Sequence, residues 1–183
     1  METIEEYNRA RSVLLKQEPS ILADALLTLA GESRSAHMLV TSLVSSTQEN
    51  IALFKQNIHE ITHQTRRNSL SGEEILDTLH RSLEMLDTTK IDPKLGLELM
   101  ASFYETDSWS LESTTELDFE FSLLYDDEGF EKFADFAQRC PDPDFVVELV
   151  KRLLTDDGYG MRTKLLDEAS TFLSEEKLKT LRT

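Results

Sequence analysis

The sequence predicts an all-α protein, a helical bundle or a short α-solenoid of antiparallel helix pairs. Apolar residues recur at three- and four-residue spacing through most of the 183-residue chain, as on the buried face of a helix. Ser, Asp, Pro and Gly signals that start or stop helices separate these runs. No stretch makes a convincing strand. The predicted links of about 2–6 residues favour antiparallel neighbours.

Three helices are expected in the N-terminal quarter of the chain. The first covers residues 3–16 and ends before Pro19. Ser20 is expected to cap a second, strongly apolar helix, and Gly31 to stop it, because Gly commonly follows a helix end. A third helix is expected to begin near Ser35.

Four further helix starts are marked by short-range capping signals. Ser46 with Glu49, and Ser71 with Glu74, have the spacing of a capping box, in which the two side chains satisfy each other's backbone N–H groups. Asp-Pro pairs at residues 92–93 and 142–143 predict an N-cap followed by proline at the first helical position.

The aromatic segment between residues 117 and 136 begins with a pattern that fits both a strand and a helix. Residues 117–123 alternate apolar and polar side chains, as in a strand, but Leu117, Phe121 and Leu124 also fit helical spacing. We favour helix because the neighbours are helical. Phenylalanines at helical spacing are usually core, and we interpret this stretch as core, the alternative being an aromatic docking groove.

One domain covering residues 1–183 is predicted. No linker rich in Pro, Gly or Ser divides the chain, and the likeliest loops are residues 68–72 and 106–110. Cys140 is the only cysteine, so no disulfide can form within the chain. The acidic N-terminus lacks the apolar region of a signal peptide, and we expect a cytoplasmic protein without membrane segments.

The charge is strongly negative and uneven. The formal net charge is −16, and residues 95–131 contain eleven Asp and Glu but no Lys or Arg. Such a surface repels phosphates and anionic lipids, so direct nucleic-acid binding and membrane binding are not expected. The excess acid either serves solubility alone or attracts a basic protein partner.

Two stretches resemble an uncharacterised bacterial family of all-helical, repeat-like domains. The C-terminal run 141–182 has an acidic turn with Tyr and Gly, at residues 156–160, before a helix rich in Leu and Ala; residues 71–123 form the second stretch. Some relatives of that family occur alongside SWIM-type zinc fingers. The resemblance implies a helical fold and no activity, and a single cysteine cannot supply the metal ligands of such a finger.

The sharpest chemical motif is HEITH at residues 59–63. On a helix, His59 and His63 share a face and could bind zinc, with Glu60 as general base. Glu84 has the spacing of a third ligand, and His80 is another candidate. This zinc-dependent hydrolase is the first alternative. The other interpretation is an amphipathic helix whose polar edge carries these side chains, which favours no cofactor, because the motif usually lies beside a sheet that is not predicted here.

The acidic clusters do not match a calcium loop. Placing Gly129 at the sixth position puts Leu124 at the first, and placing Gly160 sixth puts Leu166 at the twelfth, where an EF-hand needs oxygen ligands. We interpret both clusters as turns and caps. Cys140 before Pro141 is interpreted as a structural thiol.

The sequence therefore favours a non-enzymatic protein-interaction or scaffold module. A groove between helices, bordered by acidic residues from Glu105 to Glu131, would receive a basic peptide or partner domain, with electrostatics speeding encounter and a few aromatic or Leu anchors supplying affinity. A second alternative is an acidic mimic of nucleic acid. The expected partner surface is Glu112, Glu116, Asp118, Glu120, Asp126, Asp127 and Glu128.

Overall fold

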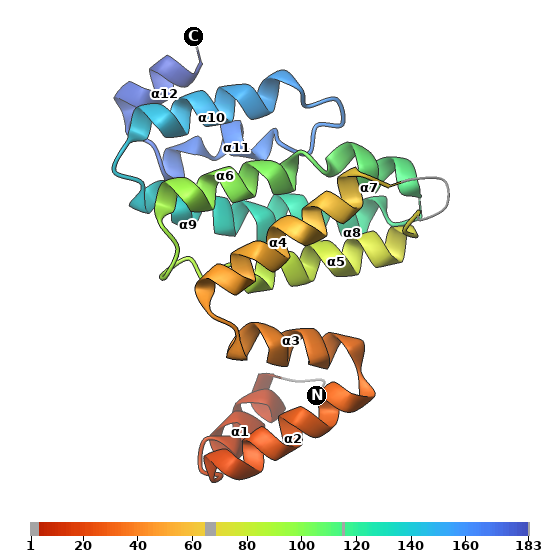
Figure 1. Ribbon diagram of the computed structural model, residues 1–183. Coiled ribbons are helices and arrows are strands. Elements are labelled where there is room, and N and C mark those ends of the chain that lie inside the picture. The colour runs from red at the N-terminus through yellow and green to blue at the C-terminus, as the bar shows by residue number, and fades with distance from the viewer. Residues whose placement is uncertain (1–3, 65–68, 115, 183) are drawn as a thin grey trace. The chain divides into compact units, whose positions relative to one another are not determined.

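The computed structural model describes residues 4–64, 69–114 and 116–182, with the backbone alone at residues 34, 35, 38 and 42. Every regular element within these ranges is a helix, and no strand occurs among them. The all-α prediction is confirmed. The helices form two compact units, Met1–Ser45 and Ser46–Thr183, and each is described by itself (Figure 1).

The first unit contains α1 (Ile4–Leu14), α2 (Pro19–Glu32) and α3 (Arg34–Val44). The boundaries of α2 differ from those predicted. Proline occupies its first turn, where no backbone N–H is needed, so Ser20 lies inside the helix. Gly31 also lies inside it and is not a stop. The hydroxyl of Ser33 accepts the N–H of Ala36 at 3.4 Å and starts α3.

The second unit is longer and begins with two helices that lie side by side, α4 and α5 (Figure 1). Later helices pack mainly as the pairs α6 with α9 and α10 with α12. The elements are α4 (Thr47–Thr62), α5 (Gly72–Met85), α6 (Pro93–Tyr104), α7 (Asp107–Ser113), α8 (Asp118–Leu123), the π-helix η1 (Leu124–Gly129), α9 (Phe130–Arg139), α10 (Pro143–Thr155), α11 (Lys164–Asp167), the 3₁₀ turn η2 (Ala169–Thr171) and α12 (Glu175–Leu181).

The four predicted helix starts in this unit are confirmed. Both capping boxes form: the N–H and the hydroxyl of Ser46 donate to Glu49, and the same arrangement begins α5. Asp92 and Asp142 accept the N–H groups three residues on. Residues 106–110, expected as a loop, instead contain the N-cap and first turn of α7. Of the other expected loop, residue 68 lies outside the described residues, and α5 begins at Gly72.

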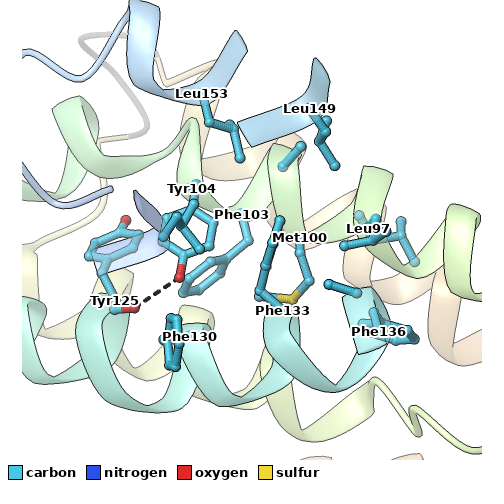
Figure 2. Close-up of a cluster of buried hydrophobic side chains, with 14 of the residues drawn as sticks. Leu97, Met100, Phe103, Tyr104, Tyr125, Phe130, Phe133, Phe136, Leu149 and Leu153 are labelled. Atoms are coloured by element: carbon cyan, nitrogen blue, oxygen red, sulfur yellow. Dashed lines mark hydrogen bonds between the residues drawn. The ribbon is translucent and has the colours of Figure 1, made fainter. Parts of the chain in front are cut away.

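A core of aromatic and aliphatic side chains fills the second unit (Figure 2). It includes Phe121, Phe130, Phe133 and Phe136, which confirms the prediction that these rings are core; Phe119, at 70% exposure, is the exception. A Cβ at Gly96 would overlap the ring of Phe136. A glycine at that position therefore allows α6 and α9 to approach closely.

Residues 118–139 are helical throughout, as favoured over a strand, but with a wider turn in the middle. Six residues of η1 adopt π-helical hydrogen bonding between α8 and α9. The carbonyl of Tyr125 in this turn accepts a hydrogen bond from the buried hydroxyl of Tyr104 at 3.1 Å, drawn as a dashed line in Figure 2. The donor from α6 thus satisfies a backbone carbonyl of the widened turn.

Candidate functional site

The HEITH motif forms the last turn of α4. His59 and Glu60 are exposed, and His63 is the C-cap residue. The two imidazole rings lie together, with centroids 3.8 Å apart. The Nδ1 atom of His63 lies 3.2 Å from the carbonyl oxygen of His59, and the amide of Gln56 donates to Glu60 at 2.9 Å. The structure thus brings both histidines together at a helix end.

The candidate third ligands lie elsewhere. His59 borders a hollow between α4 and α6 that also includes Lys55, Ser102 and Glu105. Glu84 is not among its lining residues and borders a different hollow. No group of three or more His, Cys, Asp or Glu side chains placed to hold a metal ion occurs in the described part of the chain. The zinc alternative stays a prediction.

The predicted acidic partner surface is divided by internal contacts. Four of its seven carboxylates are engaged: Glu112 accepts from the hydroxyl of Tyr159 at 2.9 Å, and Asp126, Asp127 and Glu128 contact Ser122, Lys164 and His80. The remaining three have exposed side chains with no hydrogen bond or ion pair to another described residue. These three are Glu116, Asp118 and Glu120.

A second acidic site lies between α5 and the η1–α9 helix, and we call it the acidic groove. Its volume is about 420 Å³, within the roughly 300–1,000 Å³ of ligand sites. Four carboxylates surround it, and Leu83 supplies apolar wall. The lining residues are Leu83, Glu84, Thr88, Glu128, Glu131, Lys132 and Asp135.

Two contacts shape this groove. The amine of Lys132, the one cation in the lining, donates to the carbonyl oxygen of Leu86 at 2.7 Å, at the C-terminal end of α5, and burial lowers its pKa. The imidazole Nδ1 of His80 lies 3.0 Å from a carboxylate oxygen of Glu128. Lys132 is thus tied to the backbone, so four carboxylates face one cation that is already hydrogen bonded.

This groove could be predicted from the sequence only in part. Glu128 was expected in the partner surface, Glu131 only as the end of the acidic stretch that borders a groove, and Glu84 as a candidate metal ligand; Asp135 was not named. The signal was available, because residues 128, 131 and 135 have the three- and four-residue spacing that aligns side chains on one helix face. What the spacing could not show is that Glu84 borders the same groove.

A buried ion pair holds α7 against the turn that follows α10. Arg162 is 4% exposed and Asp107 2%. Two parallel bonds join them: Nε to Oδ2 at 2.9 Å and Nη2 to Oδ1 at 2.8 Å. Nη1 of Arg162 donates to the carbonyl oxygen of Leu153 at 3.0 Å. Charge-assisted bidentate pairs of this kind are the strong hydrogen bonds of proteins, so the pair fixes the turn in place.

The same turn contains the acidic, Tyr- and Gly-containing segment on which the family resemblance rests. The carboxylate of Asp157 accepts the N–H of Arg162 at 3.3 Å. Gly160 has φ of +76°, a conformation that favours glycine. Tyr159 reaches Glu112. The Asp157 hydrogen bonds and the positive φ of Gly160 form a turn here, as interpreted from the sequence.

Three buried hydroxyl groups lie next to the Asp107–Arg162 ion pair in the core. The hydroxyl of Tyr125 lies 2.7 Å from the hydroxyl of Thr106 and 2.9 Å from that of Ser110. Burial raises the pKa of Tyr125, since the charged form would lose its water. The phenol therefore stays neutral and serves as a hydrogen-bonding group.

Cys140 is half-buried at the C-cap of α9. Its thiol lies 3.6 Å from the carbonyl oxygen of Asp142.

Comparison of the chain with protein-family models, curated proteins and solved structures found no match. Among the described residues, no helix is both long and apolar enough to cross a membrane.

Proposed function

We propose that this chain is a protein-interaction module that binds a basic segment of a partner protein in the acidic groove between α5 and α9. The observation that carries the proposal is the convergence of Glu84, Glu128, Glu131 and Asp135 on one hollow with an apolar wall. This groove shares only Glu128 with the seven residues of the partner surface expected from the sequence.

The groove suits an Arg or Lys side chain better than a neutral one. The aliphatic part of such a side chain packs on Leu83, and its charged head lies among the carboxylates, since long cationic side chains separate into an apolar stem and a polar tip. The net charge of −16 increases the rate of encounter with a basic partner. The desolvated contacts inside the groove, charged and apolar, then set the lifetime of the complex.

Binding of fluorescent Arg- and Lys-containing peptides tests this function. In the groove variant, Glu84→Gln, Glu131→Gln and Asp135→Asn remove three charges. The matched control, Glu116→Gln, Asp118→Asn and Glu120→Gln, removes the same number from the exposed surface. Each desolvated charge-assisted contact is worth about 1.5–3 kcal/mol, so we expect the groove variant to bind at least tenfold more weakly.

The control variant should lose only the long-range attraction, about twofold at physiological salt, because exposed charges are screened beyond about 8 Å. Equal losses in the two variants would reject the groove and leave net charge as the cause. No binding of any basic peptide to the natural chain would reject the proposed function.

The zinc-dependent hydrolase is the second candidate, favoured by the adjacency of the His59 and His63 rings. Elemental analysis of untagged, chelator-free protein tests it. One zinc ion per chain that is lost in His63→Ala would support it. The nucleic-acid mimic predicts instead that the chain competes with DNA for a DNA-binding protein, with steep loss of binding as salt rises.

A further inference from the structure

The hollow between α4 and α6 combines an apolar base with side chains of both charges. Its volume is about 380 Å³, within the roughly 300–1,000 Å³ of small-molecule sites. Phe54 and Ile58 of α4 line it, and they are 0% and 7% exposed. Both helices belong to the second unit and are neighbours there (Figure 1), so packing within a single unit forms the hollow.

The α4 side of the hollow supplies hydrogen-bond donors. Lys55 and His59 are exposed and line the hollow, and their spacing of four places them on one helix face. The amine of Lys55 makes no hydrogen bond or ion pair with another described residue, although the chain has a net charge of −16. The ring of His59 stacks on that of His63, and its nitrogens have no hydrogen bond within the described part of the chain. An ammonium and a ring N–H are therefore available to a carboxylate.

The α6 side of the hollow supplies acceptors. Ser102 and the C-cap residue Glu105 line it. The hydroxyl of Ser102 donates to the carbonyl of Glu98 at 3.2 Å, so its lone pairs remain for an incoming donor. Glu105 lies 3.6 Å from Arg152, and both side chains are more than half exposed. Exposed pairs of this kind are weak, so the carboxylate of Glu105 can also accept from an ammonium group.

The opposite charges of the two sides select a ligand that carries both charges. A simple carboxylic acid would be repelled by the net charge of −16 and by Glu105. A simple amine would meet the ammonium of Lys55. A zwitterion has no net charge and finds a partner for each of its ends, while an apolar side chain on it would cover Phe54 and Ile58.

We propose that this hollow binds a free amino acid with an apolar side chain. The carboxylate of the ligand accepts from the α4 side, its ammonium donates to the α6 side, and its side chain lies on the apolar base. This site is independent of the proposed peptide binding, because the hollow shares no lining residue with the acidic groove.

The first test is an NMR titration of the isotope-labelled full chain with L-leucine, in the presence of EDTA to keep metal ions off the histidines. We expect saturable shifts centred on α4 and α6, with a dissociation constant of about 1–10 mM, as suits so small a ligand. The probes 4-methylpentanoic acid and 3-methylbutylamine each lack one charge and should bind at least about threefold more weakly. No saturable shift at these helices up to about 20 mM L-leucine, or equal binding of all three probes, would overturn the proposal.

The second test changes the two sides without changing the net charge. The variant with Lys55→Gln and Glu105→Gln should bind L-leucine about tenfold more weakly, since both charged contacts are lost. The matched control carries Glu148→Gln and Lys151→Gln on α10, outside the hollow, and should bind as the natural chain does. The groove variant should also bind L-leucine normally. Equal weakening in the hollow variant and the α10 control would reject the site, and circular dichroism shows that each variant keeps its helix content.

Discussion

Removing the guanidinium of Arg162 should strongly destabilise the second unit. In the Arg162→Leu variant, Asp107 loses two hydrogen bonds and the carbonyl of Leu153 loses its side-chain donor. Asp107 then keeps only the N–H of Ser108, at 2.7 Å, while its side chain remains 3% exposed.

A buried charge without its partner costs about 3–5 kcal/mol. At about 2–4 °C per kcal/mol for a protein of this size, the midpoint of thermal unfolding should fall by roughly 6–20 °C. Urea unfolding followed by circular dichroism measures the free energy. The matched control is Arg152→Leu: Arg152 pairs with Glu105 at 3.6 Å, and both side chains are more than half exposed.

An exposed pair of that kind contributes about 0–1 kcal/mol, so the control should unfold almost as the natural chain does. Combining Arg162→Leu with Asp107→Leu should recover part of the loss, because no buried charge is then left unpaired. A loss below about 1 kcal/mol for Arg162→Leu, or one equal to that of Arg152→Leu, would refute the reasoning.

Three smaller changes test the packing, a cap and a titrating group. Gly96→Ala should cost about 1–3 kcal/mol in urea unfolding, because its Cβ would overlap the ring of Phe136; unchanged stability would contradict the close packing. Ser71→Ala removes one side of a capping box and should cost about 1 kcal/mol. Hydrogen bonds from Thr89 and Lys90 lower the pKa of Asp87 to about 2, below the usual value of about 3.9. Asp87 therefore stabilises the fold above about pH 4 and loses that effect as the pH falls through about 2, so Asp87→Asn should flatten an acid titration of stability in this window.

Local signals predicted the helices well because their causes lie within a few residues. The Ser46 and Ser71 boxes formed as expected, since each involves side chains three positions apart. Pro19 was assigned to a helix end, although proline fits a first turn as well as it fits a break. Gly31 does not end α2, because the helix continues to Glu32. Ser33 is both the C-cap of α2 and the N-cap of α3, so the start of α3 sets the boundary.

Long-range contacts could not be predicted in the same way. Asp107 and Arg162 are separated by 55 positions, and each residue alone resembles an ordinary surface charge. The acidic groove could not be predicted for the same reason. Glu84 of α5 lies near the carboxylates of η1 and α9 only because the chain folds these helices together. Periodicity gave the face on which a side chain lies and gave no information about which helix covers that face.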